Sequence, residues 1–128
     1  MKRYDPEVPP DPAEWLRLDE QERIRLIEEH HREQRIELPN LKLHAVFHAI
    51  VENQIAEQLE SSLRGLTRLT AEGLSRHDAL HAMGSVVAEH LYETMRSKDE
   101  DSAASAQARY NAAVERLTAK EWLRSYGK

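Results

Sequence analysis

Two pairs of histidines share the spacing His-x-x-x-His, at His44 and His48 and again at His77 and His81. An α-helix places residues four positions apart on the same face, one above the other. Each pair would therefore point two imidazoles at a common spot if its segment is helical. The first pair continues by one further turn to Glu52. This spacing constrains the secondary structure of both segments and, with it, the chemistry that the chain can support.

The composition agrees with a helical fold. Helix-forming residues such as Ala, Leu, Glu, Gln and Arg are plentiful, whereas the chain has only 4 Gly, 5 Pro and a single Phe. The low aromatic content disfavours a β-sandwich or barrel. A chain of 128 residues has room for one hydrophobic core. We therefore expect one all-α domain.

Helical periodicity and capping residues divide the chain into segments. Residues 1–11 contain three prolines and are expected to form an extended arm, followed by a single domain over 12–128. Asp11, Asp19, Asn40 and Ser75 are predicted N-caps, and Gly73 is a predicted helix end. The expected helices are a short one from residue 12, then 20–34, 41–60, 62–72, 76–97 and 103–126, with a polar break at 98–102. This pattern predicts a bundle of about four main helices with short connecting helices.

The paired histidines indicate a metal site. The predicted ligands are His44, His48, Glu52, His77 and His81. Imidazole and carboxylate ligands without thiolates suit a divalent transition metal such as Fe, Zn or Mn. Four imidazoles would close a tetrahedral zinc site, whereas fewer imidazoles plus Glu52 would leave a position for water. The open form would suit a metal-dependent hydrolase or oxidoreductase, and the sequence leaves open whether the protein is an enzyme.

Three further residues are candidates for the same site. Glu28 and His31 have the Glu-x-x-His spacing of di-iron carboxylate bundles, and Glu89 lies near the side of its helix that carries His77 and His81. Whether any of them joins the site stays open at this point. His30 and His90 are expected to face solvent.

Several classes of protein are disfavoured. With no Cys, the chain cannot use disulfides, iron–sulfur clusters or thiol catalysis. The net charge of −5 and the interspersed acids and bases disfavour nucleic acid as a partner. No apolar run reaches membrane-spanning length, and the N-terminus has no signal-peptide pattern. We therefore expect a cytoplasmic protein without a membrane partner.

The segments HAVFHAIVENQIA and RHDALHAMGSVVAEHLYE carry a resemblance to a known family. They resemble an uncharacterised bacterial family of short helical proteins, domain of unknown function 1841, over roughly residues 40–95. The shared pattern is His-x-x-x-His-x-x-x-Glu-x-Gln, here His44 to Gln54, followed by the second histidine pair and a downstream acid such as Glu89. The resemblance implies an all-α fold and a functional unit of His44, His48, Glu52, His77 and His81. It implies no activity.

Two hypotheses from different classes follow. In the first, the helices hold a transition metal between them. In the second, the protein is a metal-free interaction module with buried, hydrogen-bonded histidines, and the remaining exposed apolar surface forms a homodimer or binds a partner. Substitution of His44 or His77 separates them, because only a metal site would lose bound ion.

Overall fold

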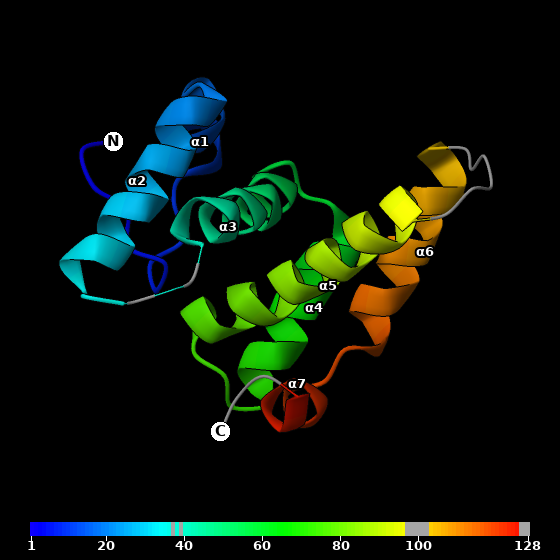
Figure 1. The fold of residues 1–128 in the computed structure, drawn as a ribbon. Coiled ribbons are helices and arrows are strands. Elements are labelled where there is room, and N and C mark those ends of the chain that lie inside the picture. The colour runs from blue at the N-terminus through cyan, green and yellow to red at the C-terminus, as the bar shows by residue number, and fades with distance from the viewer. Residues whose placement is uncertain (37, 39, 97–102, 126–128) are drawn as a thin grey trace.

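The computed structural model describes residues 1–36, 38, 40–96 and 103–125, and these contain helices and no strand. Within these described residues, seven helices follow one another in the order α1 (Pro12–Arg17), α2 (Glu20–Glu33), α3 (Leu41–Ala56), α4 (Glu60–Ala71), α5 (Arg76–Arg96), α6 (Ala103–Arg116) and α7 (Ala119–Ser125). Figure 1 shows α3 between α2 and α5, with α4, α6 and α7 on the far side of α5. The expected all-α helical bundle is confirmed.

The predicted N-caps form as expected. Each side chain accepts a hydrogen bond from a backbone N–H three residues later, which satisfies a donor that the first turn leaves unpaired. The four pairs are Asp11 with Glu14, Asp19 with Glu22, Asn40 with Leu43, and Ser75 with Asp78, at 2.9–3.1 Å. The starts of these four helices could therefore be predicted from their capping residues.

Helix α3 ends four residues before its predicted end. Gln58 has a φ of 61°, in the left-handed region that closes a helix. The backbone N–H of Gln58 donates to Ile55 O and that of Leu59 donates to Gln54 O, both at 3.0 Å, which is the Schellman pattern. A glutamine in this conformation gives no sequence signal, so the prediction that the helix continues to residue 60 was wrong.

The predicted last helix is divided into α6 and α7. Thr118 begins a new helix, because its hydroxyl accepts from the Glu121 N–H at 3.1 Å and its carbonyl accepts from the Trp122 N–H at 3.1 Å. The turn lets Ala119 enter the core while α6 keeps Val114 against α4 and α5. The break expected at 98–102, and the expected end of the chain's last helix at Tyr126, lie outside the described residues.

Two hydrophobic clusters meet at α3. One cluster lies on the side of α1 and α2 and includes Trp15, Ile27 and Ala49. The other lies among α3 to α7 and includes Val51 and Leu80. Helix α3 contributes different faces to both clusters, so the space between α2, α3 and α5 is the junction of the two halves of the bundle (Figure 1).

Residues 1–11 contain no helix, as expected, but they pack on the bundle. The side chains of Tyr4 and Pro6 are buried, and Tyr4 belongs to the cluster of α1 and α2. The arm therefore brings a tyrosine into the interior next to α3.

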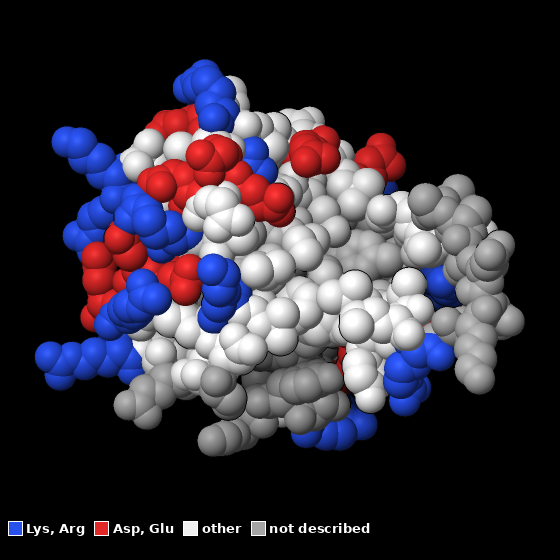
Figure 2. Space-filling view, turned by 45° about the horizontal axis from the view of Figure 1, so that its top comes forward, with Lys and Arg blue, Asp and Glu red and all other residues white. Residues whose placement is uncertain are grey.

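The molecular surface around α2 carries many charges of both signs. Ion pairs join Arg25 to Glu22 and Glu29, and Arg32 to Glu28. Figure 2 shows basic and acidic side chains interspersed at this end of the molecule, with uncharged surface across the middle of the same face. None of the described helices combines the length and apolar character needed to cross a bilayer.

Candidate metal centre

Four histidines from three helices converge at the junction of the two hydrophobic clusters. They are His31 of α2, His44 and His48 of α3, and His81 of α5, and each offers a ring nitrogen within 4.8 Å of the others. His31 and His48 are buried, and His44 and His81 are half-buried. Two nitrogens bound to one ion at about 2.1 Å can lie at most about 4.2 Å apart. A pair 4.8 Å apart would therefore have to close by about 0.6 Å at least, and by about 1.4 Å in a tetrahedral site, where ligand nitrogens lie about 3.4 Å apart.

His31 has one nitrogen fixed and the other free. The ring is 0% exposed, and its Nδ1 lies 2.8 Å from the carbonyl oxygen of Ile27, one turn earlier in α2. A carbonyl can only accept, so Nδ1 carries the proton of the neutral ring and Nε2 keeps a lone pair. Within the described residues, this buried Nε2 has no hydrogen-bond partner. The helix backbone thus holds His31 in the tautomer of a metal ligand.

His48 is held by a chain of hydrogen bonds that begins in the arm. Tyr4 donates its only hydroxyl proton to Glu52 Oε2, so the hydroxyl oxygen accepts from His48 Nε2 at 2.8 Å. Burial, and next the charge of Glu52, raise the pKa of Tyr4 well above its usual value, so the phenol stays protonated. His48 is therefore protonated on Nε2, and its buried Nδ1 has a lone pair and no partner among the described residues.

Glu52 is occupied by two other side chains. It is 1% exposed, and its two oxygens accept from Arg76 Nη1 and Nη2 at 2.8 and 2.9 Å, besides the bond from Tyr4. Glu52 was predicted as a metal ligand or proton acceptor. The structure places it behind His48, where it orients the His48 ring through Tyr4 and is itself paired with Arg76. It is not one of the four residues that converge.

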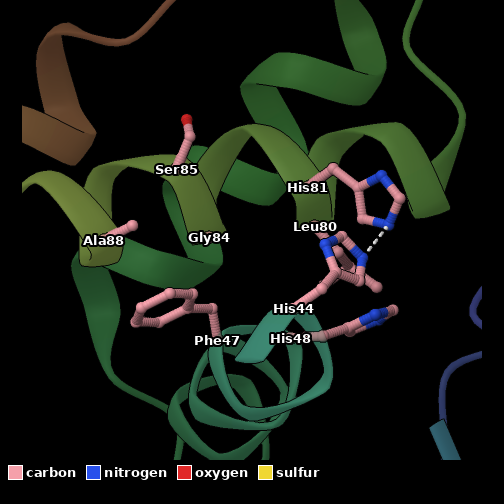
Figure 3. A pocket seen from close by; sticks show the side chains of 8 residues that line it. All are labelled: His44, Phe47, His48, Leu80, His81, Gly84, Ser85 and Ala88. Atoms are coloured by element: carbon pink, nitrogen blue, oxygen red, sulfur yellow. Dashed lines mark hydrogen bonds between the residues drawn. The ribbon is translucent and has the colours of Figure 1, made fainter. Parts of the chain in front are cut away.

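His44 and His81 face one another across α3 and α5. Their Nε2 atoms lie 2.9 Å apart, as the dashed line in Figure 3 shows. A neutral pair can form this bond only if one Nε2 carries a proton. Moving that proton to Nδ1 of the same ring would release both Nε2 lone pairs toward a common ion.

His77 lies beside the four and not among them. Its ring centroid is 4.2 Å from that of His81 and 5.2 Å from that of His31. Its Nε2 is buried without a hydrogen-bond partner in the described part of the chain, and its backbone N–H donates to Glu7 Oε1 at 3.2 Å. His77 is thus a fifth imidazole at the edge of the cluster. Of the five predicted residues, the structure groups His44, His48 and His81, and the fourth member of the group is His31.

The remaining candidates lie outside the group of four. Glu28 forms an ion pair with Arg32 at 3.3 Å, and Glu89 is exposed on α5. His30, expected to face solvent, is half-buried, with its ring centroid 5.6 Å from those of His31 and His77. His90 is also half-buried, with its Nδ1 3.2 Å from Val86 O. Both are less exposed than expected because other rings lie against them, that of His77 beside His30 and that of Tyr110 beside His90.

Burial keeps the imidazoles neutral. Desolvation lowers the pKa of His44 and of His77 to about 4 and that of His81 to about 2, with smaller contributions from neighbouring histidines. The pKa values of His31 and His48 are also lowered, chiefly by burial. Neutral imidazole is the form that binds metal, so no proton has to be removed near pH 7.

Two residues of this centre could not be identified from local sequence patterns. Tyr4 lies in an arm without helical periodicity, and Arg76 is a charged residue in a first helical turn. His31 was a candidate through its Glu-x-x-His spacing with Glu28, but this local spacing did not show that it would join the histidines of α3 and α5.

The chain was also compared with known proteins. No family model matches it, and searches of curated proteins and of solved structures find no significant match.

Proposed function

We propose that this protein binds a divalent transition metal ion, Fe, Zn or Mn, through His31, His44, His48 and His81. His77 is the alternative ligand if a fifth imidazole joins. The observation that carries the proposal is the pair of buried lone-pair nitrogens, His31 Nε2 and His48 Nδ1, each on a ring whose other nitrogen is held by the protein. Metal-binding histidines commonly have this arrangement, with the second nitrogen donating to a carbonyl or other acceptor.

The cost of leaving these nitrogens unpaired supports the proposal. His31, His48 and His77 each bury a ring nitrogen without a hydrogen-bond partner in the described residues. Each such group costs about 1–3 kcal/mol, and native proteins bury few of them. One divalent ion would satisfy two or three of these nitrogens and the facing Nε2 atoms of His44 and His81.

The coordination number of the bound ion determines whether the site has an open position at which a reaction could take place. Four imidazoles close a tetrahedral zinc site, and such an ion would tie α2, α3 and α5 together. The same ligands on a five- or six-coordinate ion such as iron or manganese leave at least one open position, where metal-bound water or oxygen chemistry becomes available. We propose a metal-binding site, and whether its reaction is hydrolytic or oxidative depends on which metal it binds.

The first experiment is elemental analysis by plasma mass spectrometry on tag-free protein purified without chelator. We expect about one equivalent of Fe, Mn or Zn per chain. The double variant His31→Ala/His81→Ala should lose it, because two of four ligands are removed from different helices. His90→Ala is the matched control, since His90 lies on α5 but makes its contacts with Val86 and Tyr110.

Absence of bound metal, even after reconstitution with each of the three ions, would refute the proposal. Circular dichroism of each variant shows whether loss of metal reflects loss of ligands or loss of fold. Retention of one equivalent of metal in the double variant would equally exclude the proposed ligand set.

A metal-free interaction module is the second candidate. It is favoured by three exposed apolar side chains near the C-terminal end of α5, Leu91, Tyr92 and Met95, which are 47%, 60% and 76% exposed. The partner we propose for this surface is a second copy of the chain. If analytical ultracentrifugation at high protein concentration gives the mass of a monomer, a homodimer is excluded. Membership of the family named by its resemblance, domain of unknown function 1841, and a cytoplasmic location are proposed on sequence alone.

A further inference from the structure

A cavity of about 190 Å³ opens directly onto the histidine cluster. It lies between α3 and α5, with His44, His48 and His81 at one end and Phe47 at the other (Figure 3). At one wall of the cavity α5 approaches α3 closely, because a Cβ built on Gly84 would lie 3.8 Å from the Phe47 Cβ, at van der Waals contact. The cavity is therefore a continuation of the proposed metal site and not a separate hollow.

The walls of this cavity away from the histidines are mainly apolar. Leu80, Gly84 and Ala88 of α5 line it opposite Phe47. The nearby Ser85 hydroxyl donates to the Ala82 carbonyl at 2.6 Å, so its proton is used by its own helix. An apolar cavity of about 150 Å³ is enough to hold one benzene ring. The space thus suits a single ring or a short branched chain with one polar end at the histidines.

The charge of the metal-loaded site determines which polar group a ligand in the cavity should carry. A divalent ion with four neutral imidazoles carries two uncompensated positive charges in a half-buried position. Glu52 cannot balance them, because it is paired with Arg76. The cavity lining contains no acidic side chain. A buried charge without a counter-charge is costly, so the missing negative charge is most readily supplied by a ligand that enters through the cavity.

We infer that the cavity binds a small monocarboxylate with one apolar group, of the size of benzoate. Its carboxylate occupies an open position on the metal ion, and its apolar part packs between Phe47 and α5. This inference rests on the proposed metal site. It adds the class of ligand, the side from which that ligand approaches, and the residues that select it.

The test uses the full chain loaded with Co²⁺, whose visible absorption reports a change of ligands. Benzoate and acetate are titrated separately into the loaded protein. Both offer the same donor atoms, but only benzoate can fill the apolar space. We expect both anions to change the cobalt spectrum, and benzoate to bind at least about tenfold more tightly because its ring leaves water.

A variant that fills the cavity tests the location. Ala88→Leu adds volume beside Phe47 without touching a histidine, and Ala112→Leu makes the same change on the exposed surface of α6. Ala88→Leu should abolish the preference for benzoate and leave cobalt and acetate binding within about twofold. Ala112→Leu should behave as the unsubstituted protein.

The outcomes separate this inference from the proposed function. If the chain binds one cobalt ion but benzoate binds no more tightly than acetate, the ligand inference is overturned and the metal site stands. A benzoate preference that survives Ala88→Leu in a folded variant also overturns it. If the chain binds neither cobalt nor any of Fe, Zn and Mn, both proposals fail.

Discussion

Replacing Glu52 with glutamine tests the role that the structure gives this residue. The substitution keeps the shape of the side chain and removes its charge. Arg76, whose side chain is 9% exposed, would then be a nearly buried cation without a counter-ion. Removing one member of a buried ion pair costs about 3–5 kcal/mol. We expect a loss of this size in the free energy of unfolding of the metal-free protein.

Urea unfolding followed by circular dichroism, in the presence of a chelator, measures this loss. The double variant Glu52→Gln/Arg76→Met supplies the control, because it removes both charges and should recover most of the lost stability. A loss below about 1 kcal/mol in the single variant would refute the claim that the two charges depend on one another.

The same variant distinguishes two roles for Glu52 in metal binding. If Glu52 only orients His48 through Tyr4, Glu52→Gln should keep one equivalent of metal and bind it about 10–100-fold more weakly. If Glu52 is itself a ligand, the stoichiometry should fall as it does for the histidine variants. Elemental analysis of the stable, folded variant decides between the two.

Three further predictions concern acid, the arm and the packing of α4. The metal-free protein should lose stability as the pH falls from 6.5 to about 4, because the unfolded chain then binds protons that His44 and His77 do not bind in the fold. The loss in the free energy of unfolding is up to about 1.4 kcal/mol per pH unit for each histidine. Equal unfolding curves at pH 7 and pH 5 would contradict this prediction. Tyr4→Phe should weaken zinc binding about 10–100-fold in a competition titration with a chromophoric chelator, since His48 loses the acceptor that sets its tautomer; unchanged affinity would exclude this role. Gly65→Ala should lower the free energy of unfolding measured in urea by about 1–2 kcal/mol, despite the better helix propensity of alanine. The reason is that the new Cβ would lie 2.8 Å from Cγ1 of the branched side chain of Val114. A more stable variant would show that α6 moves away from α4 at little cost.

The sequence predicts local structure well where a side chain acts on its own backbone. The caps Asp11, Asp19, Asn40 and Ser75 are of this kind. The turn at Gly73 was predictable for another reason, since glycine adopts its φ of 107° without strain. The prediction fails where a residue without a special propensity adopts a left-handed conformation and ends a helix, as Gln58 does after α3.

The candidate site divides in the same way. The spacing of His44 and His48 fixes their common face, because both belong to one helix. No spacing relates His31, on α2, to His81, on α5, since their proximity depends on how both helices pack against α3. The hydrogen bond from Tyr4 spans 48 residues and depends on the path of an irregular arm. Such contacts can be read only after the fold is known.

The position of the histidines between two hydrophobic clusters has a consequence for cooperativity. Each cluster could open on its own, with α3 staying attached to the other, so the metal-free chain contains two potential units of local unfolding. An ion held by α2, α3 and α5 would have to leave before either unit opened. Metal binding should therefore merge two partly independent transitions into one, and amide hydrogen exchange in α2 and α5 should slow together.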